Sequence, residues 1–278
     1  MSEPIRIAYG ETPTSYGELS VPGGPGSFPV VMLLHGGCWL ASRGAMEDYR
    51  QMAEALLGDG IAAWNVEYSR VGHDHGGWPG TFRDLGGALD HLAVLAGAHA
   101  LDLARVVVLG HSSGGHFGAW LAARPKLPAD STIKGAPKVA LAGAVINDAF
   151  IDPRVIDSTG VDGELYCGEP IIERLIGGDP AERTDRMKEI SPLEWLPWGV
   201  PQAYVVNSGR YPVTPYRALA QGRTTLDMPD YPALARAAGD AIEVEIVEGA
   251  DHFDFIHEPG TEGFEAVRRA VVKLIGRI

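Results

Sequence analysis

The most constraining feature of this sequence is a run of apolar residues, FPVVMLL at positions 28–34, that no polar side chain interrupts. A strand with water on one face alternates apolar and polar residues, whereas a strand buried on both faces is apolar throughout. RVVVLG at 105–110 has the same character. These runs predict a mostly parallel sheet that is covered by helices on both faces.

Segments of strand and helix character alternate along the chain, which is typical of an α/β protein. Residues 45–58, for example, place apolar side chains at helical spacing and are followed by Gly60. The predicted strands are 5–10, 16–22, 28–37, 61–69, 105–110, 138–148, 201–209 and 242–249, the first two antiparallel at the sheet edge. The predicted helices are 45–58, 82–96, 116–124 and 263–275. We expect one domain over residues 1–278.

Two stretches interrupt this alternation. Residues 149–198 hold short, proline-interrupted helical pieces, and residues 210–230 are rich in turn-forming residues. Long excursions between the strands of a sheet usually cover a functional site. The first is predicted to be a lid and the second a loop insertion, with Trp39, Trp195, Trp198 and Tyr211 as candidates for an aromatic substrate pocket.

Composition excludes several classes of function. The chain has 278 residues, 45% of them apolar, and a formal net charge of −13. The apolar content is too high for a disordered protein, and the negative charge disfavours binding to nucleic acid or to an anionic membrane. The expected partner is a small-molecule substrate. The oligomeric state stays open, a homodimer included.

The sequence carries no recognisable targeting signal. Charged Glu3 and Arg6 stand where a signal peptide would place its apolar core, and the longest apolar run is far shorter than a membrane span. The two cysteines, Cys38 and Cys167, are too few for a disulfide framework. We therefore expect free thiols in a cytoplasmic protein, although a single bridge between them is conceivable.

The strongest motif is Gly-His-Ser-Ser-Gly-Gly at residues 110–115, which follows a predicted buried strand and opens a predicted helix. A G-x-S-x-G sequence needs this context, because the strained turn lifts the serine hydroxyl out of the sheet. It also directs a helix N-terminus at developing negative charge. Ser112 is the predicted nucleophile. The alternative is a glycine-rich turn in which the serine is incidental.

A second motif, HGGCW at residues 35–39, also follows a buried strand directly. Consecutive glycines let backbone N–H groups face a cavity without obstruction by side chains. The N–H groups of Gly36 or Gly37 and of Ser113 are predicted to hold an oxyanion. Losing one such donor typically costs roughly 3–4 kcal/mol of activation free energy.

A third motif, GADHF at residues 249–253, lies just after the last predicted strand. A serine hydroxyl needs a base within hydrogen-bonding distance to become a nucleophile. His252 is the predicted base and His257 the weaker alternative. A His-x-His pair at residues 73 and 75 lacks a third ligand at a suitable spacing, so we predict no metal and no cofactor.

These three motifs resemble those of α/β-hydrolase-fold enzymes of the kynurenine formamidase and HGG-type esterase group. The similarity extends from residues 16–22 to the final helix. It implies an eight-stranded sheet, with Ser112 as nucleophile, His252 as base, and Gly36, Gly37 and Ser113 around the oxyanion. The HGG-x-W sequence is similar to the formamidase signature, which implies N-formyl aryl amides, although simple esterases share it.

The acid of the resembled triad is missing from its usual place. That position, after the strand at 201–209, holds Tyr211. We favour Asp148, at the end of the preceding strand, although it could instead cap the first helix of the lid. Asp227 and Asp230 in the second insertion are alternatives, and Asp251 is too near His252 in sequence for good geometry.

The predicted function is therefore a metal-free serine hydrolase that cleaves a carboxylic ester or an N-formyl aryl amide through an acyl-enzyme. The missing aspartate allows two alternatives on the same fold. One is a non-hydrolytic enzyme, a cyclase or lyase, that uses Ser112 as hydrogen-bond donor and His252 as proton shuttle. The other is a catalytically silent receptor for a small ligand.

Overall fold

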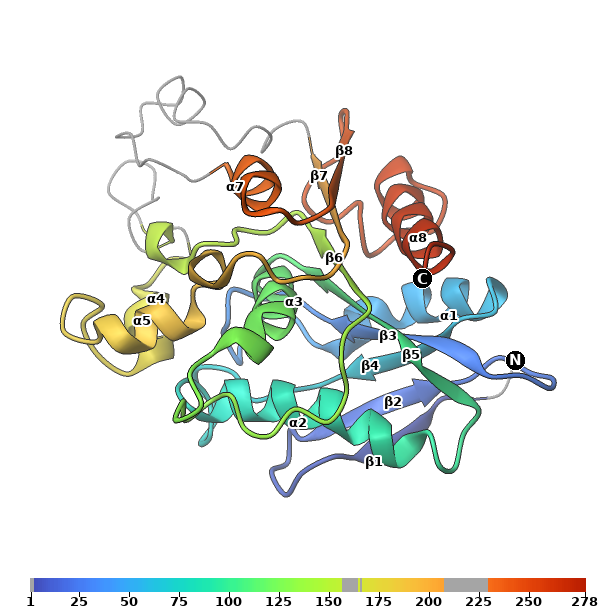
Figure 1. The fold of residues 1–278 in the computed structure, drawn as a ribbon, viewed down its shortest axis with the longest axis horizontal. Coiled ribbons are helices and arrows are strands. Elements are labelled where there is room, and N and C mark those ends of the chain that lie inside the picture. Colours follow the sequence, from blue (N-terminus) through green and yellow to red (C-terminus); the bar gives the residue numbers. More distant parts are fainter. Residues whose placement is uncertain (1–2, 157–164, 166, 208–229) are drawn as a thin grey trace.

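A computed structural model describes the chain except for residues 1–2, 157–164, 166 and 208–229. The described residues form an eight-stranded sheet with the order β1-β2-β4-β3-β5-β6-β7-β8 (Figure 1). Its strands are β1 Ile5–Ala8, β2 Tyr16–Ser20, β3 Phe28–Leu34, β4 Ala62–Val66, β5 Leu101–His111, β6 Gly143–Asn147, β7 Gln202–Asn207 and β8 Ile242–Val247. The pairs β1–β2 and β2–β4 are antiparallel and the others parallel. The predicted fold class is confirmed.

Helices cover both faces of this sheet. Helices α1 (Arg50–Gly58) and α8 (Glu262–Ile275) lie on one face, and α2 (Gly80–Leu95) and α3 (Ser113–Ala123) on the other (Figure 1). Alternate residues of β3 pack into the two cores, Met32 on the α2–α3 side and Leu33 on the α1–α8 side, and neither is exposed. This two-sided burial explains the uninterrupted apolar run, since burying each such side chain stabilises the folded state by about 1.5–3 kcal/mol.

The parallel arrangement brings the carboxyl ends of β3, β5, β6, β7 and β8 to one edge of the sheet. Residues that immediately follow these strands therefore become neighbours although they are far apart in sequence. In open α/β sheets, ligands bind at this edge. All three sequence motifs lie there, because each follows the end of a parallel strand.

The segment 149–198 contains the short helices that the sequence predicts. They are η3 Pro153–Val155, α4 Ile171–Ile176, α5 Thr184–Ile190 and η4 Pro192–Trp195. Figure 1 shows α4 and α5 beside α3, on the far side of the molecule from α8. Of the second predicted insertion, only Asp230 lies within the described residues. It precedes α7 (Tyr231–Ala238), a helix that the sequence analysis did not predict.

The prediction of two free thiols is wrong, because Cys38 and Cys167 form a disulfide with their Cα atoms 5.9 Å apart. Cys38 follows β3, and Cys167 lies in the 149–198 segment, 129 residues later. The fold brings the two together, which no local pattern indicates. Disulfides persist mainly in oxidising compartments. The expected free thiols therefore no longer support a cytoplasmic location.

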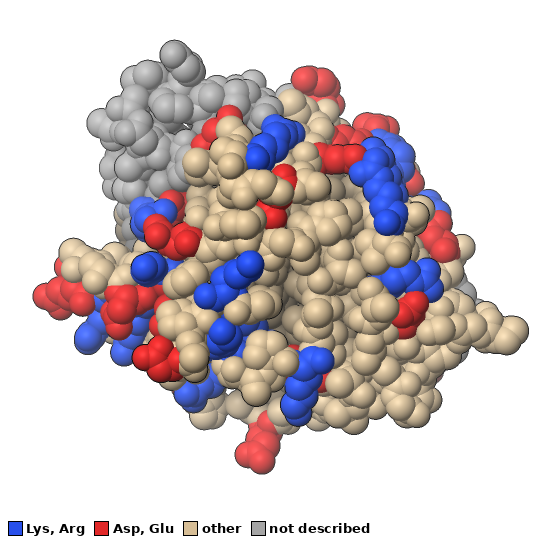
Figure 2. All heavy atoms as spheres, in the orientation of Figure 1, with Lys and Arg blue, Asp and Glu red and all other residues tan. Residues whose placement is uncertain are grey.

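Acidic and basic side chains are interspersed on the face shown in Figure 2. Many exposed charges belong to ion pairs, such as those of Arg268 with Asp59 and of Arg269 with Glu245. Such pairs each stabilise a protein by about 0–1 kcal/mol, so the two cores carry most of the stability. Across the described residues, every helix is too short or too polar to cross a bilayer.

Candidate active site

Ser112 lies on a sharp turn between β5 and α3, as predicted. Its backbone has φ 55° and ψ −124°, a conformation that non-glycine residues rarely adopt. The Ser112 N–H donates to the carbonyl oxygen of Asn147 at 3.0 Å, which ties the turn to the end of β6. The backbone approaches closely here, because a Cβ on Gly114 would lie 2.1 Å from the carbonyl oxygen of Leu34. The small residues of the motif therefore make this turn possible.

His252 and Asp148 are brought together from positions 104 residues apart. The Nδ1–H of His252 donates to Oδ2 of Asp148 at 2.5 Å. Asp148 follows β6 and is fully buried, whereas His252, in the loop after β8, is 24% exposed. This geometry fixes the tautomer of the imidazole, which leaves Nε2 as the nitrogen that can accept a proton.

Asn207 at the end of β7 completes the surroundings of this carboxylate. Its side-chain amide donates to both oxygens of Asp148 at 3.0 Å, and its backbone N–H donates to Oδ1 at 3.3 Å. A buried carboxylate requires such donors. Asn207 was not predicted to be a site residue. Its role depends on the neighbouring strand, so the sequence carried no signal for it.

The alternative acids have other contacts. Asp230 caps α7 by accepting the N–H of Ala233 at 3.1 Å. Asp251 accepts the N–H of Phe253 at 2.7 Å and is exposed. Tyr211 and Asp227 lie outside the described residues. Of the acids that are described, Asp148 is the one that His252 contacts.

The alternative base has a different surrounding. The Nε2 of His257 lies 3.9 Å from a carboxylate oxygen of Asp48, and its side chain is 46% exposed. His252, by contrast, is bonded to a buried carboxylate. The described contacts therefore favour His252 over His257 as the base.

The HGG loop, residues 35–44, lies against the serine turn. A Cβ on Gly36 would be 3.0 Å from the Cβ of Ser112, so the two backbones are in close contact. Gly37 has φ 119°, and a Cβ there would lie 2.0 Å from the carbonyl oxygen of Arg43. Gly37 therefore has to be glycine, and any larger residue at Gly36 would be tightly packed against Ser112. Ser113 is the first residue of α3, so its N–H has no partner within the helix.

His111 contributes to the site in a way that the sequence analysis missed. Its Nε2–H donates to the backbone carbonyl oxygen of His252 at 2.8 Å, and the two imidazole centroids are 4.4 Å apart. His111, which precedes Ser112, therefore supports the backbone of His252. Its position within the motif gave no indication of this contact, because the partner is 141 residues away.

The predicted aromatic pocket is not assembled as expected. Trp39 and Trp198 are 3% and 4% exposed and belong to the core. Their indole N–H groups donate to Nδ1 of His116 and to the carbonyl of Pro192. Trp195 is partly buried and packs against that core. Tyr211 lies outside the described residues.

Phe253 is a largely exposed aromatic residue beside His252. It is 56% exposed, and its ring centroid lies 5.2 Å from that of His252. A large apolar side chain exposed at the edge of a site offers contact area to a substrate. Phe253 is the last residue of the GADHF motif and was not predicted to have a role.

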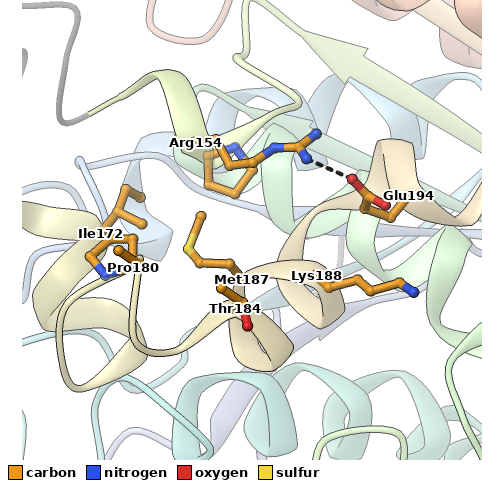
Figure 3. Close-up of a pocket in the computed structure, with 9 residues that line it drawn as sticks. Arg154, Ile172, Pro180, Thr184, Met187, Lys188 and Glu194 are labelled. Atoms are coloured by element: carbon orange, nitrogen blue, oxygen red, sulfur yellow. Dashed lines mark hydrogen bonds and ion pairs between the residues drawn. The ribbon is translucent and has the colours of Figure 1, made fainter.

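A separate cavity of about 460 Å³ lies within the 149–198 segment (Figure 3). The Arg154 guanidinium and the Glu194 carboxylate form an ion pair of 2.6 Å beside it. The described residues that line the cavity are Pro153, Arg154, Ile172, Pro180, Ala181, Thr184, Met187, Lys188 and Glu194. None of them is a predicted site residue.

One cluster of metal-ligand types coincides with the site. Ligand atoms of His111, Asp148 and His252 lie within 4.8 Å of one another. A divalent ion there would have to displace the proton between His252 and Asp148. The cluster is therefore better suited to proton transfer than to holding a resident metal.

Backbone strain is concentrated at this edge of the sheet. Among the described residues, the non-glycine positions with positive φ are Cys38, Trp39, Ser112 and Asp148. They lie beyond the ends of β3, β5 and β6, the strands that precede the HGG loop, the serine turn and Asp148. Strained residues cluster at functional sites, where the surrounding structure over-determines them.

Comparisons with known proteins agree with the fold. A carbohydrate esterase from gut microbiota, in truncated form, has a TM-score of 0.74 at 17% identity, covering 98% of this chain and 95% of that one. Butyrate-bound esterase 2 of the planctomycete Thermogutta terrifontis has a TM-score of 0.72 at 16% identity, covering 99% and 94%. The same esterase phosphoramylated by tabun scores 0.70 at 17% identity, covering 100% and 95%. No curated protein matched the sequence.

At these identities the neighbours establish the fold. The family follows from a separate match, in which the BD-FAE family model covers residues 20–220, most of the chain. This span includes the HGG loop, the serine turn and Asp148. The chain belongs to the BD-FAE family, an esterase-type domain of the α/β-hydrolase class.

Proposed function

We propose that the protein is a serine esterase, in which Ser112 is the nucleophile, His252 the general base and Asp148 the acid that orients it. The observation that carries this proposal is the hydrogen bond from His252 to the buried Asp148, beside the strained serine turn. A hydroxyl, an imidazole and a buried carboxylate in this arrangement recur on unrelated folds for acyl transfer.

In the acylation step, the Ser112 oxygen attacks the carbonyl carbon of the ester while Nε2 of His252 takes its proton. The Asp148 carboxylate stabilises the resulting imidazolium through Nδ1–H. His252 then protonates the leaving alcohol, and the serine keeps the acyl group. In deacylation, His252 activates water in the same way, which releases the carboxylic acid and restores the serine.

Negative charge develops on the carbonyl oxygen in both steps. The N–H groups of Gly36 or Gly37 and of Ser113 are the proposed donors, and the N-terminus of α3 adds its positive dipole end. Each donor is expected to contribute roughly 3–4 kcal/mol of transition-state stabilisation. The close contact of Gly36 with Ser112 supports this assignment.

The preferred substrate is a carboxylic ester. An N-formyl aryl amide is the second candidate, favoured by the HGGCW sequence and by the exposed Phe253 beside His252. The cyclase, lyase and receptor alternatives were considered because Tyr211 occupies the position where the family usually has its aspartate. The hydrogen bond between His252 and Asp148 argues against them, because it gives the base its acid.

The proposal is tested by labelling with a fluorophosphonate probe, followed by mass spectrometry. We expect the label on Ser112, and at least a 10³-fold loss of kcat for p-nitrophenyl acetate and butyrate in Ser112→Ala. Comparing these esters with N-formylkynurenine separates esterase from formamidase. Full turnover by Ser112→Ala would refute the mechanism.

A further inference from the structure

A buried polar cluster lies next to the site but takes no direct part in the proposed chemistry. We call it the Glu67 network and define it as His35, Glu67, Tyr68 and Arg70. These residues follow the ends of β3 and β4, and each is at most 5% exposed. Buried charges are expensive unless they are paired and hydrogen-bonded. The network therefore needs an explanation beyond packing.

Glu67 is the centre of this network. Its carboxylate accepts from Nη2 of Arg70 at 2.8 Å and from the backbone N–H groups of Met46 and Tyr68, and it lies 3.3 Å from Nε2 of His35. Burial alone would raise the pKa of Glu67. The His35 hydrogen bond, the charges of His35 and Arg70 and the Tyr68 N–H outweigh burial and lower the pKa to about 2. Glu67 is thus ionised when the enzyme works.

Arg70 connects this carboxylate to the HGG loop. Its Nη1 donates to the carbonyl oxygen of Arg43 at 2.9 Å and to that of Gly44. The Arg43 carbonyl is the group that a Cβ on Gly37 would meet at 2.0 Å. Arg70 therefore holds the backbone directly behind Gly37.

His35 and Tyr68 hold the other end of the same loop. The Tyr68 hydroxyl donates to the carbonyl oxygen of His35 at 2.5 Å, and the two rings are stacked with centroids 4.5 Å apart. Nδ1 of His35 lies 2.8 Å from the carbonyl oxygen of Gly36. Both peptide units that flank Gly36 are thus fixed through the network.

We propose that Glu67 and Arg70 are positioning residues for the oxyanion site: their ion pair fixes the HGG loop so that the N–H of Gly36 or Gly37 faces the substrate oxygen. The inference rests on the proposed function, since it concerns the same oxyanion. Donors must lie about 2.7–3.1 Å from the developing oxyanion, and a misplacement of about 1 Å can reduce the rate 10²-fold. Neither residue is proposed to touch the substrate.

The test compares Glu67→Gln with Asp90→Asn. Asp90 forms a 2.8 Å ion pair with Arg124, whose side chain is 4% exposed, so this variant also breaks a largely buried pair but lies outside the network. The measurements are kcat and KM for p-nitrophenyl butyrate, Ki for an alkyl trifluoromethyl ketone, and the thermal midpoint. The ketone forms a hemiketal with the serine, and its oxyanion occupies the same donors.

For Glu67→Gln we expect kcat to fall about 10- to 100-fold with KM within twofold, and Ki to weaken by a similar factor. Asp90→Asn should lower the thermal midpoint and leave kcat and Ki unchanged. A Glu67→Gln enzyme that matches Asp90→Asn in kcat and Ki overturns the inference. If Glu67→Gln does not fold, Arg70→Lys and Tyr68→Phe provide the same test, and unchanged kcat and Ki in both overturn it.

The wild-type enzyme separates this inference from the proposed function. If it hydrolyses esters and is labelled at Ser112 while the network variants behave like Asp90→Asn, only the positioning role fails. If it neither hydrolyses esters or formamides nor reacts with the fluorophosphonate, the proposed function fails and the positioning role is overturned with it.

Discussion

Asp148→Asn is the most informative substitution at the proposed catalytic centre. The native carboxylate accepts from His252 at 2.5 Å and from the Asn207 amide at 3.0 Å, and water does not reach it. An asparagine has nearly the same shape, so packing should survive. It brings N–H donors and no charge to a position where His252 and Asn207 already donate.

Two losses follow from this change. The imidazolium that forms in the transition state loses a buried negative partner. An asparagine N–H facing Nδ1 also favours the tautomer that carries its proton on Nε2, which cannot accept the serine proton. The equivalent change in a Ser-His-Asp protease costs about 10⁴ in kcat. We expect a loss of about 10³–10⁴, equivalent to about 4–5.5 kcal/mol of activation free energy.

The assay is hydrolysis of p-nitrophenyl butyrate at neutral pH, with circular dichroism to verify folding. Asp230→Asn is the matched control, because Asp230 caps α7 and asparagine caps helices equally well. Its kcat should stay within twofold of the wild type. An Asp148→Asn enzyme that folds and retains more than a tenth of the wild-type kcat would refute the assignment of the acid.

Three further outcomes are expected. Burial lowers the pKa of His116 to about 4, so below about pH 6.5 the unfolded chain binds a proton that the folded protein does not. The free energy of unfolding should therefore fall by about 3 kcal/mol between pH 6.5 and 4. Urea unfolding measures this fall, which should be smaller in His116→Gln. The Cys38–Cys167 bridge closes a long loop, which should stabilise the folded protein by about 5 kcal/mol. Reducing it, or replacing Cys167 with serine, should lower the thermal midpoint by about 10 °C. Equal midpoints with and without dithiothreitol would contradict this. Phe253→Ala should reduce kcat/KM about tenfold for aryl esters relative to alkyl esters, and Phe253→Leu less, whereas equal losses on both ester classes would exclude a specificity role.

Much of the fold could be predicted from the sequence because the signals are local. Apolar runs identified the central strands, and helical spacing identified the main helices. The start of α3 was predicted at 116 rather than Ser113, because glycines at 114 and 115 weaken a helical pattern. The early part of β5, from Leu101, was missed because it interleaves polar residues and only its later part is fully buried.

In the candidate site, too, residues in local motifs could be predicted, whereas residues that depend on long-range contacts could not. Ser112 and His252 could be predicted because each lies in a short motif at a strand end. Asp148 could only be favoured over other acids, since the choice depends on which strand ends meet in space. Asn207, His111 and the disulfide depend on contacts across 59, 141 and 129 residues, and local sequence holds no information about such distances.

The positive-φ residues at the edge of the sheet have a consequence for protein engineering. Conformations of this kind typically cost about 1–3 kcal/mol each, so four of them together are comparable with the net stability of about 5–15 kcal/mol of an ordinary domain. Glycine at position 112 or 148 would relax the backbone and remove a group that the proposed chemistry requires. A variant library selected only for heat resistance should therefore enrich inactive proteins at these positions, and selection must score turnover together with melting temperature.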